Sequence, residues 1–236
     1  DLINRKTYNE DGVGGMHVYS PWWLDNKKLD FPRGYHIEID RSFAMPQYGF
    51  GYNPNELNRF FGLKVGGYGD KLRQDVKKYY GSIIGLSGRG EAIPRKDNYC
   101  EIDPDTKDKW GIPVLKFRYK WSDYEIKQVK HMHDTFEELA HNMGGIALGN
   151  KPTKEQNYGI SAPGEIIHEV GTTRMGDDPY NSVVNKYERL HDVDNVYVVD
   201  GGPFVSQADK NPTWTIMALS WRTSEYIIDQ LKKQNI

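Results

Sequence analysis

Three short stretches in the last third of the chain carry residue types that could act on a small molecule. His168 is a candidate proton acceptor, because a neutral imidazole takes up a proton near neutral pH. Asp200 and Gly201 follow a β-branched run, as in a buried strand that opens into a ligand-facing turn. Asn211-Pro212 starts a helical pattern, and the free N–H groups at a helix N-terminus favour negative charge. Together they predict a site that combines a base with a ligand-facing turn and an anion-favouring helix end.

Two elements would have to position these residues. The first is a strand over residues 195–200, with Asp200 at its carboxyl end. The second is a helix in which Asn211 is the N-cap and Pro212 occupies the first helical position, where its missing N–H costs nothing. The helix is predicted by residues that recur at helical spacing, namely Ile216, Leu219, Thr223, Ile227 and Leu231.

Read as letters, the same stretches form a longer pattern. The chain has H-E-V-G-T-T-R-M-G from His168, V-V-D-G from Val198 and N-P-T-W-T-I-M-A-L from Asn211. In this order and spacing they resemble the C-terminal signature of the glucose–methanol–choline (GMC) family of flavin oxidoreductases, H-x-x-G-T-x-x-M-G, V-V-D-[GA] and N-P-T-x-T-I-M-A-L. The large subunits of gluconate and glucoside-3 dehydrogenases are similar in character. The resemblance implies an α/β (α+β) fold, in which a substrate domain of mixed or antiparallel sheet and helices is joined by a C-terminal strand and helix that complete an FAD-binding fold.

The resemblance also implies a chemistry. Oxidising an alcohol removes a hydroxyl proton and a hydride, and the hydride needs an organic acceptor because no side chain accepts one. By resemblance the acceptor is FAD, His168 is the base, and Asn211 holds the substrate oxygen. Many family members have a second histidine where this chain has Asn211, so one histidine would carry the proton transfer. The residues implied to contact FAD are Asp200, Gly201, Asn211, Pro212 and Thr213.

Each of these residues also has a purely structural interpretation. A single histidine such as His168 is often an ordinary core or surface residue. Asn211 could serve only as a helix cap, which is compatible with a role in the site. Asp200 could serve only to cap a turn.

The dinucleotide-binding pattern G-x-G-x-x-G is absent. Gly12-Val13-Gly14-Gly15 and Gly49-Phe50-Gly51 both fail to match it. The resemblance therefore implies that the N-terminal dinucleotide-binding part is missing and that the chain is a C-terminal piece. We expect a substrate-binding domain over residues 1–160, with part of the FAD domain around 70–95, and a region over 161–236 that closes the flavin site.

Several further elements are predicted upstream. Residues 35–40 alternate as a strand does, with His36, Glu38 and Asp40 on one face, which we interpret as a solvated face and not as a metal site. The stretch from Trp22-Trp23 to this strand loosely resembles GMC-type sugar dehydrogenases. The other predictions are a helix over 71–81, a strand within 82–94, and an antiparallel pair formed by 98–104 and 112–119.

The clearest helix covers residues 122–143. Ser122 and Glu125 form a capping box at its start, and Gly144-Gly145 ends it. Its apolar stripe is Ile126, Val129, Met132, Phe136, Leu139 and Met143. His131 and His133 are two positions apart, so they diverge around the helix and cannot easily share a metal.

Composition limits the class of partner. The net charge of −2 gives no argument for nucleic acid or an anionic membrane, and no apolar run is long enough to span a bilayer. The single cysteine, Cys100, excludes an internal disulfide and a cysteine-rich zinc site. The 16 Tyr and 6 Trp suit a carbohydrate site, because flat rings cover sugar C–H faces, although such residues also fill ordinary cores.

The expected function is FAD-dependent oxidation of a CH–OH group of a sugar or sugar acid, with electrons passed to an acceptor other than oxygen. The resemblance implies a sugar or polyol substrate, a small subunit and a cytochrome c subunit as partners, and a periplasmic location, with the cytoplasm left open. Two alternatives stay open: an oxidase of the same family that uses oxygen, and a non-catalytic carbohydrate-binding relative.

Overall fold

The chain folds into two compact units, each built from two segments. The computed structural model describes residues 16–19, 27, 29–41, 68–79, 84–147 and 150–235. The first unit combines Asp1–Arg89 with Lys127–Gly159, and the second combines Gly90–Ile126 with Ile160–Ile236. The glycine-rich stretches at 12–15 and 49–51 and the Trp22-Trp23 pair lie outside the described residues.

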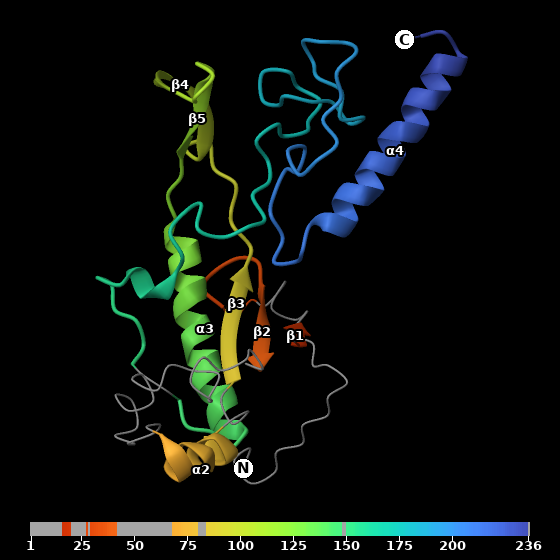
Figure 1. The fold of residues 1–236 in the computed structure, drawn as a ribbon. Coiled ribbons are helices and arrows are strands. Elements are labelled where there is room, and N and C mark those ends of the chain that lie inside the picture. Colours follow the sequence, from red (N-terminus) through yellow and green to blue (C-terminus); the bar gives the residue numbers. More distant parts are fainter. Residues whose placement is uncertain are drawn as a thin grey trace. The chain divides into compact units, whose positions relative to one another are not determined.

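The described part of the first unit contains a three-stranded sheet, helix α2 and most of helix α3. Strands β1 (Met16–Tyr19), β2 (Tyr35–Arg41) and β3 (Ile84–Gly90) form a sheet in the order β1-β2-β3 (Figure 1). β1 pairs with β2 in antiparallel register. Helices α2 (Gly69–Tyr79) and α3 (Asp123–Asn142) accompany the sheet, so the strands predicted at 35–40 and 82–94 and the helices predicted at 71–81 and 122–143 are confirmed.

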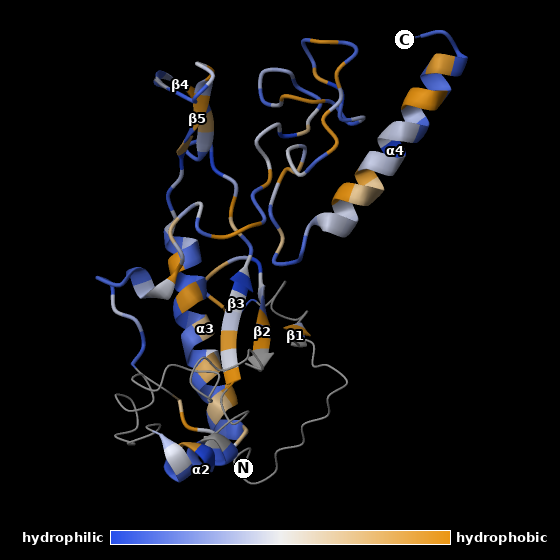
Figure 2. Ribbon diagram, viewed as in Figure 1, coloured by the Kyte–Doolittle hydropathy of each residue, from blue (hydrophilic) through white to orange (hydrophobic). Residues whose placement is uncertain are grey.

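The core of this unit lies between α3 and the sheet. Its buried hydrophobic members are Phe31, Tyr35, Ile37 and Met132, with Leu86 and the α3 residues Val129, Phe136 and Leu139 packed against them. Figure 2 shows the mixture of hydrophobic and hydrophilic segments along α3 that an amphipathic helix produces. The apolar stripe predicted for this helix is thus the face that buries against the strands.

The hydroxyl of Tyr35 links the core to α3 by hydrogen bonds. That oxygen lies 2.7 Å from His131 Nδ1 and 2.9 Å from Thr135 Oγ1. Burial raises the pKa of Tyr35 to about 12, so the hydroxyl stays protonated and available for these bonds. His133 turns to a different partner, the carbonyl oxygen of Tyr158 at 2.9 Å, which confirms that His131 and His133 diverge.

The interpretation of the His36 face of β2 as solvated is wrong for His36 itself. This side chain is fully buried, and Glu38 beside it is only 17% exposed. The reason is the neighbouring strand, because β1 places the rings of His17 and Tyr19 within 5.1 and 4.9 Å of the His36 ring, centroid to centroid. Sequence alternation alone does not reveal such a neighbour.

The capping box at the start of α3 is confirmed. Glu125 accepts the backbone N–H of Ser122 at 2.7 Å and also bonds the Ser122 hydroxyl, while Ser122 Oγ accepts the N–H of Tyr124 at 3.3 Å. The second carboxylate oxygen accepts the N–H of Ile93 at 2.8 Å. Glu125 therefore ties the loop that follows β3 to the start of the helix.

A pH-dependent contribution to stability follows from Glu125. Burial acts to raise the pKa of its carboxyl, but the Ser122 hydroxyl and the N–H groups of Ile93 and Ser122 outweigh it and lower the pKa. A depressed folded-state pKa stabilises the protein above the unfolded value of about 4.3, and this contribution is lost as pH falls through the folded value. Glu125→Gln should therefore lower the free energy of unfolding by about 1–2 kcal/mol at pH 7, since charged hydrogen bonds are lost.

The difference between wild type and Glu125→Gln should shrink as pH falls below the unfolded value of about 4.3 and on through the lowered folded-state pKa of Glu125, because both side chains are neutral only below that pKa. Chemical denaturation across this pH range measures it. A difference that stays constant with pH would show that the charge of Glu125 does not contribute.

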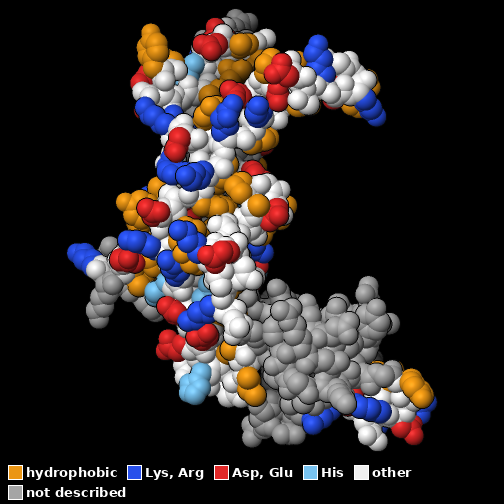
Figure 3. All heavy atoms as spheres, turned by 90° about the vertical axis from the view of Figure 1, so that its left-hand side faces the viewer, with side chains coloured by type: hydrophobic (Ala, Val, Ile, Leu, Met, Phe, Trp, Pro, Cys, Tyr) orange, Lys and Arg blue, Asp and Glu red, His pale blue; other side chains and the backbone are white. Residues whose placement is uncertain are grey.

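In the second unit, β4 (Tyr99–Lys107) and β5 (Pro113–Arg118) form the predicted antiparallel pair, with Ile102 opposite Leu115. The pair leaves Ile102, Leu115 and Phe117 between 57% and 66% exposed. Figure 3 shows hydrophobic side chains reaching the surface on one face of the molecule, among charged ones.

The rest of the second unit is mainly irregular chain followed by one long helix. Residues 160–212 form turns and isolated bridges, such as that between Arg189 and Tyr197, and α4 (Thr213–Lys232) comes after them. No helix in the described part of the chain is both long and apolar enough to cross a membrane.

Candidate functional site

The three stretches singled out from the sequence meet in the second unit. The segment after His168 runs beside the turn after Asp200 and is bound to it by three backbone hydrogen bonds. Gly171 N donates to Gly201 O at 3.1 Å and Thr173 N donates to Gly202 O at 3.1 Å, and the third bond runs from Met175 N to Pro203 O at 3.0 Å. Segments about thirty residues apart are thus held side by side by main-chain groups alone.

The turn itself leaves no room for side chains at two successive positions. A Cβ on Gly202 would lie 2.1 Å from Thr173 Oγ1 and 2.9 Å from Asp200 Oδ1. A Cβ on Gly201 would lie 3.0 Å from Val170 Cγ1 and 3.7 Å from Cδ1 of Ile216, which belongs to the first turn of α4. The glycines therefore allow close approach of all three stretches, as expected where backbone meets backbone or ligand.

Asp200 stabilises this turn. Its Oδ1 accepts the backbone N–H of Gly202 at 2.7 Å, which is the capping interaction weighed as its structural role. The side chain is exposed, so the other oxygen can still meet a ligand. Capping the turn and contacting a cofactor are compatible roles for this residue.

The prediction that Asn211 caps the C-terminal helix is wrong. Helix α4 begins at Thr213 with Pro212 in the N-cap position, and no side-chain cap bond is formed. The carbonyl of Pro212 accepts the first helical bond, from Ile216 N at 3.0 Å. Pro212 suits this place because it has no N–H to satisfy, and Asn211, one residue earlier, remains exposed with its amide unused by the helix.

The strand predicted over 195–200 is also not formed. Within this segment Asn195 belongs to a turn and Tyr197 forms an isolated bridge with Arg189, beside bonds from Val198 N to Glu188 O at 2.8 Å and from Leu190 N to Val196 O at 3.0 Å. Val199 is 46% exposed. A buried strand needs partners on both edges, and the described residues supply a partner on one edge only, the segment from Glu188 to Leu190.

His168 stands at the start of this arrangement in an unusual backbone conformation. Its φ of 86° lies in the positive-φ region that few residues other than glycine adopt. The residue is partly buried, and its imidazole makes no hydrogen bond to the part of the chain that the structure describes. The side chain is thus positioned by strained backbone and keeps both ring nitrogens for another partner.

Sequence reasoning missed the contact that holds α4 in place. Glu188 and Thr223 are both fully buried, and Thr223 Oγ1 donates to Glu188 Oε2 at 2.6 Å. The rings of Tyr187 and Tyr226 stack beside them at 3.8 Å between centroids. Thr223 belongs to the predicted helical stripe, but the sequence alone gave no sign that its partner would be a buried carboxyl.

The chain is similar to a family of known proteins. Residues 94–220 match the family model described as GMC oxidoreductase. The chain is similar to the fructose dehydrogenase large subunit of Gluconobacter japonicus, at 26% identity over 99% of the chain and 42% of that protein. It is similar to the gluconate 2-dehydrogenase flavoprotein of Pantoea cypripedii, at 26% identity over 70% of the chain and 27% of that protein.

An oxidase is also among the similar proteins. The chain is 32% identical to the 6'''-hydroxyparomomycin C oxidase of Streptomyces lividus, over 98% of the chain and 42% of that protein. The chain thus spans less than half the length of the curated relatives it matches. The matched region contains the His168 segment, the Asp200 turn and the start of α4, and it covers more than half of the chain. The chain belongs to the GMC oxidoreductase family.

Proposed function

We propose that the full-length protein is an FAD-dependent dehydrogenase that oxidises a CH–OH group of a sugar or sugar acid and passes the electrons to an acceptor other than oxygen. The observation that carries the proposal is the meeting of the His168 segment, the Gly201–Gly202 turn and the first turn of α4 in one unit. A candidate base, a glycine turn and a helix N-terminus thus belong to segments that lie against one another, which supports the proposal. The division into a substrate-binding domain over 1–160 and a flavin-closing region over 161–236 belongs to this proposal.

The residues at this site fit a flavin. Gly201 is partly exposed and carries no side chain, and the first turn of α4 contains no acidic residue to neutralise its positive end. The holding residues would be Asp200, Gly201, Asn211, Pro212 and Thr213. Bound there, FAD supplies the hydride acceptor that no side chain can provide. The α4 N-terminus would stabilise negative charge on a neighbouring group by about 1 kcal/mol or more.

The chain's own residues would handle the proton. His168 takes the proton of the substrate hydroxyl, and its unoccupied imidazole suits this role. Asn211 orients the same oxygen through its exposed side-chain amide, which the helix does not use. Asn211 has no capping role beside this one, because no side-chain cap bond is formed at α4.

The substrate class rests on the relatives. Fructose and gluconate appear in the names of two similar proteins, and both are polyhydroxylated molecules with oxidisable CH–OH groups. The Gluconobacter relative is a large subunit, which supports partner subunits for this protein too, and we propose a small subunit and a cytochrome c subunit.

An oxidase is the second candidate, favoured by the similarity to the Streptomyces lividus enzyme. The two are separated by one experiment on the full-length protein, in which sugars, sugar acids and polyols are offered anaerobically with a redox dye and aerobically with peroxide detection. Dye reduction without peroxide supports the dehydrogenase, whereas stoichiometric peroxide supports the oxidase. A protein without flavin absorbance and without either activity would contradict both and favour a carbohydrate-binding relative.

A further inference from the structure

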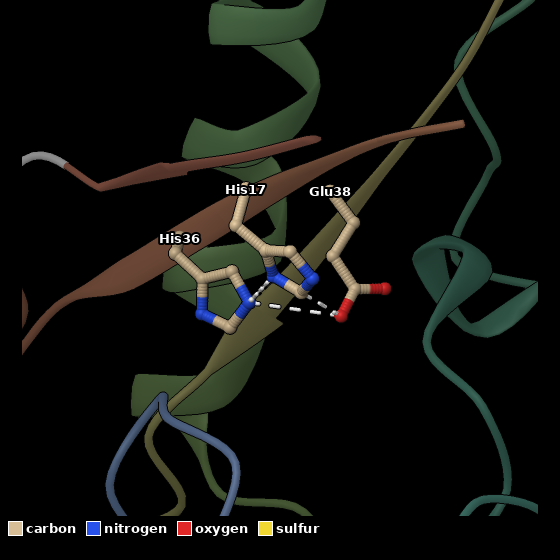
Figure 4. A group of neighbouring side chains, drawn as sticks. All are labelled: His17, His36 and Glu38. Carbon is tan, nitrogen blue, oxygen red and sulfur yellow. Dashed lines mark hydrogen bonds and ion pairs between the residues drawn. The ribbon is translucent and has the colours of Figure 1, made fainter. Parts of the chain in front are cut away.

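The first unit contains a second cluster of chemically capable side chains, remote in sequence from the site above. His17 projects from β1, and His36 and Glu38 project from β2 (Figure 4). In the antiparallel register His17 stands opposite Glu38, and His36 is the next residue on the same face. Figure 4 shows the three side chains turned towards one another.

Three ligand-type atoms converge in this cluster. His17 Nδ1 lies 3.1 Å from His36 Nε2, and both nitrogens lie 3.7 Å from Glu38 Oε1. A tetrahedral ion bound at about 2.0–2.1 Å holds its ligand atoms about 3.3–3.4 Å apart. The three observed separations bracket this value, so one ion fits between the atoms with only small side-chain movements.

The carboxylate is held in place from its far side. Glu38 Oε2 is bound by Arg89, at 3.0 Å from Nε and 2.9 Å from one terminal nitrogen. The guanidinium therefore occupies the outer oxygen and leaves Oε1 directed at the histidines. Ligating carboxylates in metal sites commonly have such a hydrogen-bonded support.

We propose that His17 Nδ1, His36 Nε2 and Glu38 Oε1 bind one divalent transition-metal ion of the zinc type. Two imidazoles and a carboxylate are ligands that zinc accepts, and three protein ligands leave a fourth tetrahedral position for water. Because the ligands come from two strands, the bound ion links β1 to β2. Without the ion the two imidazoles share a hydrogen bond, and metal binding requires the donor imidazole to carry its proton on its other ring nitrogen.

The test uses zinc itself and the full-length protein, first freed of metal with a chelator. Titration with Zn²⁺ alone, in competition with a chromophoric chelator at neutral pH, should show one equivalent bound. His17→Ala should weaken zinc binding by at least about 100-fold. Loss of a residue that only supports a ligand already lowers metal affinity by about 10–100-fold, and loss of the ligand itself should lower it at least as much. Glu38→Gln should also weaken binding, since it keeps the shape but removes the anionic ligand.

The matched control is His141→Ala, which removes an exposed histidine in the last turn of α3. This variant should bind zinc as the wild type does. His17 is itself exposed, so its replacement leaves the core intact, whereas His36 is buried and is not used. Co²⁺ in place of zinc should give the visible absorption of a tetrahedral site in wild type and His141→Ala.

A thermal measurement gives an independent readout, since an ion that binds only the folded state raises the unfolding temperature. Zinc should raise it for wild type and His141→Ala but not for His17→Ala. Failure of the wild type to bind one equivalent would overturn the proposal. Equal zinc binding by wild type and His17→Ala would overturn it as well, and would leave the three side chains as a hydrogen-bonded group only.

Discussion

Replacing His168 with alanine is expected to slow substrate-dependent flavin reduction in the full-length protein by about 10²–10⁴-fold, while FAD stays bound. Hydride leaves the carbon readily only while the oxygen sheds its proton, so the base must lie within hydrogen-bond reach of that oxygen. His168 is the histidine that opens the segment bound to the Gly201–Gly202 turn. Rapid mixing with substrate under anaerobic conditions measures the reductive rate directly.

His168→Asn provides the matched comparison. Asparagine tolerates the left-handed conformation at φ 86° better than alanine does, so this variant removes the imidazole with less disturbance of the backbone. Both variants should be equally slow if the base is what is lost. A His168→Asn enzyme with an undiminished reductive rate would contradict the proton-acceptor role.

Asn211→Ala should reduce the rate less than the His168 variants do, because it removes an orienting amide and not the base. It should leave α4 intact, since Asn211 makes no cap bond to the helix. Looser flavin binding in this variant would therefore report a direct contact with the cofactor and not a frayed helix.

The second large effect concerns stability. Thr223→Val should lower the free energy of unfolding by about 2–3 kcal/mol, because it leaves the buried Glu188 carboxyl without a donor. Thr223 Oγ1 is the hydrogen-bond donor to Glu188 Oε2, and Oε1 has no hydrogen-bond partner among the described residues. Valine matches threonine in shape, so packing is retained and only the hydroxyl is lost. Chemical denaturation of the full-length protein measures the change.

Ser224→Ala is the control for this prediction. It removes a hydroxyl one residue further along α4, but Ser224 is exposed and bonds only to the helix carbonyl of Ser220. Ser224→Ala should change the free energy of unfolding by no more than about 0.5 kcal/mol. Combining Thr223→Val with Glu188→Met should recover much of the loss, because replacing both partners by apolar groups removes the unsatisfied carboxyl. A double variant as unstable as the sum of both single changes would contradict this account.

Local signals in the sequence predicted the elements whose determinants lie within them. The capping box of Ser122 and Glu125 and the apolar stripe with Met132 were sufficient to predict α3. The β4–β5 pair followed from alternation and from a connection too short for a crossover. The His168 segment and the Asp200 turn, two of the three stretches of the candidate site, are joined by backbone bonds that no side-chain pattern encodes.

The predictions that were wrong concern residues whose structure depends on a neighbouring segment of the chain. Residues 195–200 have the composition of a buried strand, but the described chain offers a partner on one edge only. Asn211 has the residue type of an N-cap, yet Pro212 takes that position because its carbonyl accepts the bond from Ile216. His36 is buried because β1 lies beside it, and the strand register that joins His17 to Glu38 is a tertiary fact.

The backbone at His168 has a consequence for protein engineering. A side chain held at φ 86° costs about 1–2 kcal/mol that glycine would not pay. Selection for heat resistance alone would therefore favour His168→Gly, since relief of strain raises the melting temperature. The same replacement removes the proposed base, so a change that raises the thermal stability at this position would lower the catalytic rate. Stabilising libraries for this protein should keep residue 168 fixed.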